Sequence, residues 1–117
     1  MSGDGGGKQT EVAVQAHLHA LGQGIEQILE GYGSDAILLT PNGSVQGLSA
    51  IRQYYEDFIR DTLPLLAASY SLQRFDVIGE AAYLTWKAEP SIPMGTDTFL
   101  VHKGKIVLHT TSMFMQP

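Results

Sequence analysis

The sequence predicts an α+β domain in which N-terminal helices pack against one face of a curved antiparallel sheet. Apolar residues recur at helical spacing in two segments between residues 10 and 62. The second half contains segments rich in β-branched and aromatic residues, separated by turn signals. Because helices come first and a strand meander follows, the order favours α+β over an alternating arrangement. The 117 residues suit one domain at residues 10–117, and we expect the glycine-rich residues 1–9 to be a flexible leader.

Two helices are expected, one from about Thr10 to Glu30 and one from about Leu48 to Thr62. Each carries its apolar side chains on a single face, which is the face that would pack on the sheet. These side chains are Val14, Leu18, Leu21, Ile25, Ile28 and Leu29 in the first helix, and Leu48, Ile51, Tyr55, Phe58 and Ile59 in the second.

Glycine and proline mark the weak points and ends of these helices. Gly22 and Gly24 each weaken the first helix by about 1 kcal/mol relative to alanine. We expect Pro64 to end the second helix, because proline lacks a backbone donor. Between the helices, residues 36–40 predict a short strand that stops at the turn signal of residues 41–43.

Four further strands are expected at residues 67–77, 81–88, 96–102 and 105–115, with hairpin turns at 79–80 and 103–104. Apolar residues occupy both faces of the last strands. Leu100, Ile106 and Leu108 would be poorly placed on the solvent face of a monomer. We therefore expect a homodimer formed through the sheet.

Composition excludes several classes of function. The net charge is −5 and no basic stripe with interleaved aromatics is present, so we expect no nucleic-acid partner. Cysteine is absent, which excludes a disulfide framework and a thiolate nucleophile. His17 and His19 lie two apart on a helix and face different directions, so we expect no metal site and no cofactor. No apolar run approaches about 18 residues and no secretory signal is evident, so we expect a cytoplasmic protein without a membrane span.

Asp97 is the most informative residue, because it interrupts the apolar, β-branched run of residues 96–101. A buried carboxylate costs free energy unless it has partners or stays protonated. We expect Asp97 to point into a pocket and to have a raised pKa, since burial disfavours its charged form. Acids with shifted pKa values gather at functional sites.

His109 is the candidate partner of Asp97, and the hairpin turn decides whether the two meet. If residues 102–104 form a three-residue turn, Asp97 faces His109 across the two strands. If the turn is only Lys103-Gly104, Asp97 faces Thr110 instead and His109 turns outward. We favour the first register. The pair would then perform acid–base chemistry, or else form a cross-strand ion pair that only stabilises the hairpin.

Other side chains are expected to line the same pocket. Phe99, Thr111 and Met113 would share the inner face of the hairpin with Asp97 and His109. Tyr32, Tyr55 and Trp86 are aromatic candidates for the remaining walls, although aromatic residues at such spacing also form ordinary cores.

The order of these motifs resembles the NTF2-like superfamily, which includes ketosteroid isomerases and SnoaL-like polyketide cyclases. The resemblance rests on the long amphipathic helix, on residues 32–36, 41–43 and 47–52, and on the hairpin of residues 97–107. It covers nearly the whole chain after residue 10. It implies a cone-shaped sheet wrapped around a pocket, closed by helices and commonly dimerised through its outer face.

The resemblance carries over to the site at one position only. Asp97 falls where ketosteroid isomerases have a protonated aspartic acid that donates to an oxyanion. The isomerase base corresponds to Thr40, and its helix tyrosine lies near Ala16. Threonine cannot shuttle a proton near neutral pH and alanine donates nothing, so steroid isomerisation by that mechanism is not expected.

The expected function is therefore binding of a small apolar molecule. In one hypothesis the protein is a cofactor-free isomerase, cyclase or hydrolase that uses Asp97 with His109 as acid and base. In the other it is a ligand-binding or dimerisation module without chemistry.

Overall fold

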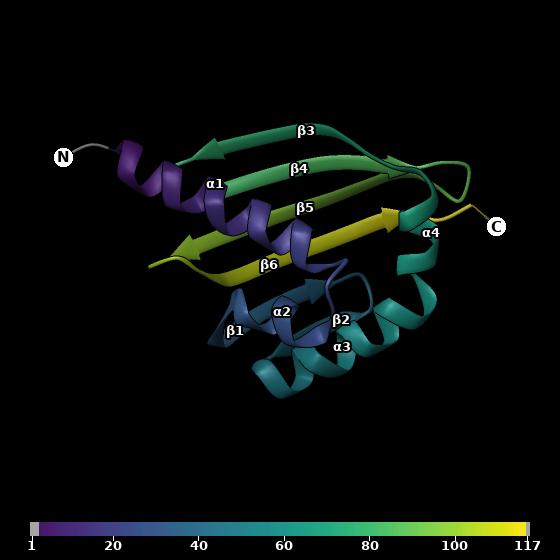
Figure 1. Ribbon diagram of the computed structural model, residues 1–117, viewed down its shortest axis with the longest axis horizontal. Coiled ribbons are helices and arrows are strands. Elements are labelled where there is room, and N and C mark those ends of the chain that lie inside the picture. The colour runs from purple at the N-terminus through teal and green to yellow at the C-terminus, as the bar shows by residue number, and fades with distance from the viewer. Residues whose placement is uncertain (1–2, 117) are drawn as a thin grey trace.

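The computed structural model describes residues 3–116, in which four helices cover one face of a curved, open six-stranded sheet (Figure 1). The strand order is β2-β1-β6-β5-β4-β3. β1 and β6 run parallel, and all other neighbouring strands are antiparallel. The α+β class and the curved sheet packed against helices are confirmed.

The helices are α1 (Gly3–Ala20), α2 (Ile25–Glu30), α3 (Leu48–Asp61) and α4 (Leu63–Ser69). The strands are β1 (Tyr32–Thr40), β2 (Gly43–Gln46), β3 (Tyr70–Ile78), β4 (Ala81–Ala88), β5 (Ile92–His102) and β6 (Lys105–Phe114). In Figure 1, α1 lies across the middle strands, while α3 and α4 follow the lower edge and one end of the sheet. No helix within residues 3–116 covers the opposite face of the sheet.

Part of the segment that we expected to be a flexible leader is helical. α1 begins at Gly3, so residues 3–9 are helical, while residues 1 and 2 lie outside the described part of the chain. Thr10 anchors this part of the helix, because it is fully buried and its Oγ1 lies 2.8 Å from the carbonyl oxygen of Gly6 and 2.7 Å from that of Gly79, which share its one hydroxyl proton. These bonds join the start of α1 to the β3–β4 turn.

Two helix boundaries also differ from the sequence prediction. The single helix expected over residues 10–30 is broken into α1 and α2, and Gly24 at the break has a φ of 119°, which favours glycine. Pro64 lies in the first turn of α4, which begins at Leu63, since proline fits the first turn of a helix where no backbone donor is needed. Residues 67–69 are therefore helical, and β3 starts at Tyr70.

The β5–β6 hairpin corrects the predicted register. Its turn contains only Lys103 and Gly104, with φ values of 52° and 78°, as a type I′ turn requires. A bulge then pairs Leu100 with Leu108 but Val101 with Ile106. Phe99 consequently faces His109, and Asp97 faces Thr111. The favoured three-residue turn, with Asp97 directly opposite His109, is wrong.

The outward orientation of His109 predicted for a two-residue turn is also wrong. The extra residue in the bulge reverses the inside–outside alternation, so Ile106 and His109 are both buried although they are three positions apart. Ile106, which we expected on the outer face, is therefore fully buried in the core.

The core lies between the helices and the inner face of the sheet. β4 alternates regularly, with Ala82, Leu84, Trp86 and Ala88 buried. Val14, Ile28 and Ile51 approach the sheet from α1, α2 and α3. Burying a side chain of this size stabilises the fold by roughly 1.5–3 kcal/mol.

An apolar row crosses the outer face of the sheet at paired positions on five strands. Going from β3 to β1, it consists of Ile78, Ala81, Leu100, Leu108 and Ile37. Ile78 is 81% exposed and Leu100 is 39% exposed. No helix among the described residues covers this face.

Candidate functional site

An inner cavity of about 40 Å³ lies between the helices and the concave face of the sheet. This volume has room for a few water-sized molecules, since a cavity needs about 10–15 Å³ for one water. Its lining comes from α1, α3, α4 and strands β3–β6, and consists of His17, Leu18, Leu21, Tyr54, Tyr55, Phe58, Leu66, Tyr70, Trp86, Asp97, Phe99, His109, Thr111 and Met113. The wall is mainly apolar and aromatic, with a small set of polar groups.

Asp97 and His109 meet on this wall. Nε2 of His109 lies 2.7 Å from Oδ1 of Asp97, and the two side chains are 3% and 13% exposed. They are diagonal neighbours on β5 and β6, which brings long side chains within reach of each other. The predicted contact between Asp97 and His109 is therefore present, but it results from the bulge and not from direct pairing of the two residues.

The second ring nitrogen of His109 is also engaged. Nδ1 lies 2.7 Å from the Tyr32 hydroxyl, which lies 2.7 Å from the Tyr55 hydroxyl. Nε2–H donates to Asp97 in either protonation state; Nδ1 accepts the Tyr32 proton if the imidazole is neutral and donates to the Tyr32 oxygen if the ring is charged. A continuous chain of hydrogen bonds therefore runs from Tyr55 through Tyr32 and His109 to Asp97, and Asp97 and Tyr55 at its two ends both line the cavity.

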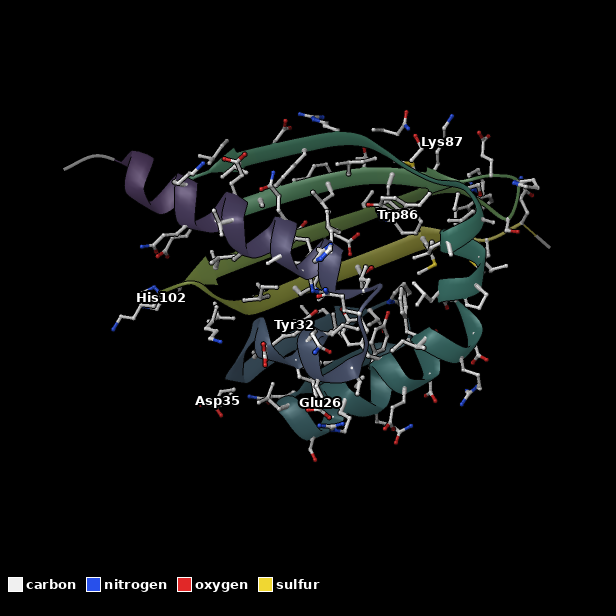
Figure 2. All side chains as sticks on the ribbon, in the orientation of Figure 1. Glu26, Tyr32, Asp35, Trp86, Lys87 and His102 are labelled. Carbon is white, nitrogen blue, oxygen red and sulfur yellow. The ribbon has the colours of Figure 1, made fainter. Side chains whose placement is uncertain are left out.

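Trp86 binds the other oxygen of Asp97. Its indole Nε1 donates to Oδ2 at 2.7 Å. Gly95, paired with Trp86 on the neighbouring strand, makes room for the ring, because a Cβ there would lie 2.2 Å from two indole carbons. Figure 2 shows Trp86 near the end of the sheet that α4 covers, and Tyr32 in the centre of the molecule. The absence of a side chain at Gly95 thus leaves space for the indole ring of Trp86, which donates the hydrogen bond to Asp97.

The pKa of Asp97 is lowered, which corrects our expectation of a raised value. Burial alone would raise the pKa, but it is outweighed by the hydrogen bond and charge of His109 and by hydrogen bonds from Trp86 and Thr111. Asp97 is therefore a carboxylate at neutral pH. It accepts hydrogen bonds and protons, and it does not serve as the neutral donor that the isomerase resemblance implied.

The tyrosines around the site remain protonated. Burial raises the pKa of Tyr32 and of Tyr55 far above the ordinary range, and raises that of Tyr54 and Tyr70 to about 12. Tyr32 and Tyr55 are engaged in the hydrogen-bond chain to His109, whereas the hydroxyls of Tyr54 and Tyr70 keep their protons as hydrogen-bond donors at neutral pH.

His17 is the polar residue of the site that sequence reasoning missed. It is 4% exposed, and its Nδ1 is buried with no hydrogen-bond partner among residues 3–116. Burial and the charge of His109 lower its pKa to about 3, although Asp97 acts in the opposite direction, so the ring is neutral. Leaving such a nitrogen unpaired costs about 1–3 kcal/mol. The signal was present in the sequence, since His17 follows Val14 by three residues and precedes Leu21 by four, on the apolar face of the helix.

The structure brings several of the other predicted wall residues together around the cavity. Tyr55, Trp86, Phe99, Thr111 and Met113 line the cavity with Asp97 and His109. Tyr32 does not line it and instead lies behind the wall, between Tyr55 and His109. Thr40, at the isomerase base position, lies outside the cavity and bonds to the Gly43 carbonyl oxygen in the β1–β2 turn.

An outer groove of about 460 Å³ adjoins the cavity between α3 and the end of β6. The two share Tyr54, Phe58, Thr111 and Met113 as common wall residues. The groove lies within the range of about 300–1,000 Å³ typical of small-molecule sites, whereas the cavity is far smaller. Movement of these shared side chains would join the two spaces.

Two negative findings concern the described residues 3–116. They contain no group of three or more histidine, aspartate or glutamate residues arranged to hold a metal ion. Within the same range, no helix is long and apolar enough to cross a membrane.

No protein-family model matches this sequence, and no curated protein sequence matches it at a significant level. Solved structures do match the fold. An NTF2-like protein of unknown function from Mesorhizobium loti gives a TM-score of 0.74 at 16% identity, covering 92% of this chain and 93% of that one. A SnoaL-like protein of unknown function from Burkholderia thailandensis gives 0.72 at 10% identity, covering 92% and 95%. A de novo designed protein with a curved β-sheet gives 0.71 at 15% identity, covering 92% and 86%.

The chain therefore has the NTF2-like fold, and the resemblance drawn from the sequence motifs is confirmed. At these identities the likeness concerns the fold alone, and one of the matching chains is a de novo designed protein. Function has to be argued from the site.

Proposed function

We propose that this protein is a cofactor-free acid–base enzyme that acts on a small, largely apolar carbonyl compound, with Asp97 as the proton acceptor. The observation that carries the proposal is the 2.7 Å bond between His109 and Asp97 on the wall of the cavity. A buried, oriented carboxylate beside an apolar cavity is the arrangement that proton abstraction needs.

The lowered pKa of Asp97 keeps it ionised at neutral pH, so it can accept a proton, but it makes Asp97 a weaker base than a carboxylate of ordinary pKa. An ionised carboxylate takes a proton, and its two oxygens together can accept about four hydrogen bonds. Oδ1 accepts from His109, Oδ2 accepts from Trp86, and Thr111 is a third donor, so capacity for about one further hydrogen bond remains for a substrate. Both nitrogens of His109 already have protein partners, so His109 is a positioning residue that holds Asp97.

The reaction that fits these roles is enolisation. Asp97 takes a proton from the carbon next to the carbonyl, the C–H electron pair forms a carbon–carbon double bond, and the carbonyl π electrons move to oxygen. If the substrate carries a carbon–carbon double bond next to that carbon, the enolate is a dienolate, and return of the proton to its far end moves the double bond into conjugation with the carbonyl, which gives an isomerase. Attack of the enolate carbon on a second carbonyl of the same molecule gives a cyclase, with the proton delivered to the new alkoxide. Neither the isomerisation nor the cyclisation involves a change of oxidation state, so neither needs an oxidant or a reductant.

The volumes limit how the substrate binds. The cavity of about 40 Å³ accepts only the reacting end of a molecule, while the groove of about 460 Å³ accommodates the remainder. Tyr54, Phe58 and Met113 stand between the two spaces and are the side chains that would have to move. Rotamer changes of partly buried side chains such as these occur without unfolding of the domain.

A second candidate function is ligand binding without chemistry. It is favoured by the pairing inside the dyad, since both nitrogens of His109 and both oxygens of Asp97 already have partners within the protein. In that case the dyad and the tyrosine chain stabilise the curved sheet, and the cavity and groove only bind.

Exchange of substrate protons for deuterium tests for an enzyme without knowledge of the product. Small ketones and lactones are incubated with the full chain in D₂O, and loss of the proton signal next to the carbonyl is followed by NMR. We expect exchange of at least one compound to depend on the protein. Asp97→Asn should lower that rate by roughly 10²-fold or more, the usual scale for loss of a general base, while the variant stays folded.

The matched control is Asp35→Asn, which changes an exposed aspartate on β1 and should leave the exchange rate unchanged. If Asp97→Asn lowers the melting temperature and leaves exchange intact, Asp97 is a structural ion-pair partner, because breaking a buried pair on one side costs about 3–5 kcal/mol. That result would exclude the catalytic role and leave ligand binding.

A further inference from the structure

We propose that His17 binds the ligand's carbonyl oxygen in the inner cavity, as a neutral imidazole that donates a hydrogen bond. The inference rests on the proposed site, because His17 and Asp97 line the same cavity. His17 would recognise the ligand, and the ligand must have a carbonyl oxygen. It remains meaningful if the protein binds a carbonyl compound without transforming it.

The surroundings of His17 leave its Nδ1 without a hydrogen-bond partner among residues 3–116. Its ring makes edge-to-face contacts with Tyr32, Tyr55, Phe99 and His109, at centroid distances of 5.3–6.1 Å. The Tyr32 hydroxyl bonds to Tyr55 and to His109. Both tyrosine hydroxyls are therefore engaged with each other and with His109, and neither bonds to His17. An almost fully buried imidazole with an orphaned nitrogen is unfavourable in an apolar core and has a reason to exist at a binding site.

The chemistry of His17 selects the kind of ligand atom. A neutral imidazole has one N–H donor and one acceptor nitrogen. The pKa of about 3 keeps the ring uncharged, so it would not attract a carboxylate as an ion partner. A neutral imidazole can polarise a carbonyl group by hydrogen bonding to its oxygen.

The position of His17 complements that of Asp97. His17 comes from α1 in the helical layer, and Asp97 comes from β5 in the sheet, so they reach the cavity from different layers. A carbonyl compound held with its oxygen at His17 would place its remaining atoms toward the sheet. His19 offers no second site of this kind, because it is exposed on the same helix.

The experiment uses cyclopentanone as the probe and cyclopentane as the matched compound without oxygen. The full chain is labelled with ¹⁵N, and the ring nitrogens of His17 are followed by NMR during titration with each compound. We expect cyclopentanone to shift the proton-bearing nitrogen of His17, and cyclopentane to leave it nearly unchanged.

His17→Phe keeps an aromatic ring of similar size but removes both nitrogens, and should weaken cyclopentanone binding about tenfold. His17→Gln restores a donor and should recover part of the affinity, while His19→Phe should bind as the unchanged chain does. If cyclopentanone binds the unchanged chain and His17→Phe equally, or fails to shift His17 up to its solubility limit, the inference is overturned. Failure of the proposed enzyme would be seen separately, as cyclopentanone binding through His17 with no deuterium exchange of any compound tested.

Discussion

Acid should destabilise this protein well above the pH at which its carboxylates are protonated, because His17 is buried as a neutral ring. In the folded state its pKa is about 3, against an ordinary value of 6.5. The unfolded chain therefore binds a proton at His17 below pH 6.5 that the folded chain does not bind. Stability present above pH 6.5 is lost as the pH falls from 6.5 toward 3.

The size of the effect follows from that window. Each pH unit below 6.5 removes about 1.4 kcal/mol until the folded ring itself protonates, so two units, down to pH 4.5, remove roughly 3 kcal/mol. The pKa of Asp97 lies below 3.8, so Asp97 stays ionised throughout this range and does not contribute. A loss of this size is a large fraction of the roughly 5–15 kcal/mol that stabilises a typical domain.

Urea denaturation at pH 7.5 and pH 4.5 measures the loss. For a denaturant slope of about 1–3 kcal/mol per molar urea, the midpoint should fall by roughly 1–3 M between the two pH values. In His17→Phe the urea midpoint should fall by roughly 1–3 M less between the two pH values, because phenylalanine cannot bind a proton in the unfolded chain. His19→Gln, an exposed change on the same helix, should behave as the unchanged chain. Equal pH dependence in His17→Phe and the unchanged chain would refute the reasoning.

Two further predictions concern Trp86 and the outer face of the sheet. Gly95→Ala should destabilise the fold by about 1–3 kcal/mol and alter tryptophan fluorescence, because the new Cβ overlaps the indole ring and displaces the donor to Asp97; unchanged melting and fluorescence would show that the ring is not held there. We also propose a homodimer through the apolar row on the outer face, so light scattering at micromolar concentration should give twice the chain mass, and Leu100→Lys should give the monomer. A monomeric mass for the unchanged chain would rule out the dimer.

The sequence alone determined the class of fold and the order of most elements. Amphipathic periodicity located α3 and much of α1, and the turn signals at residues 79–80 and 103–104 located both C-terminal hairpins. These features follow from local preferences of neighbouring residues, so a sequence pattern contains them. The interrupted apolar run likewise identified Asp97 as a residue that needed partners.

Tertiary structure decided how the site is assembled. The bulge that turns His109 inward depends on how whole strands pair, and either register satisfied the local turn signals. The sign of the Asp97 pKa shift depended on three donors from β4 and β6 that outweigh burial, and spacing within β5 could not reveal them. His17 became a functional candidate only when its neighbours on β1, α3, β5 and β6 left its nitrogen without a partner. A linear sequence states which groups exist, but burial and hydrogen bonding among distant segments decide which of them remain unpaired and available to a ligand.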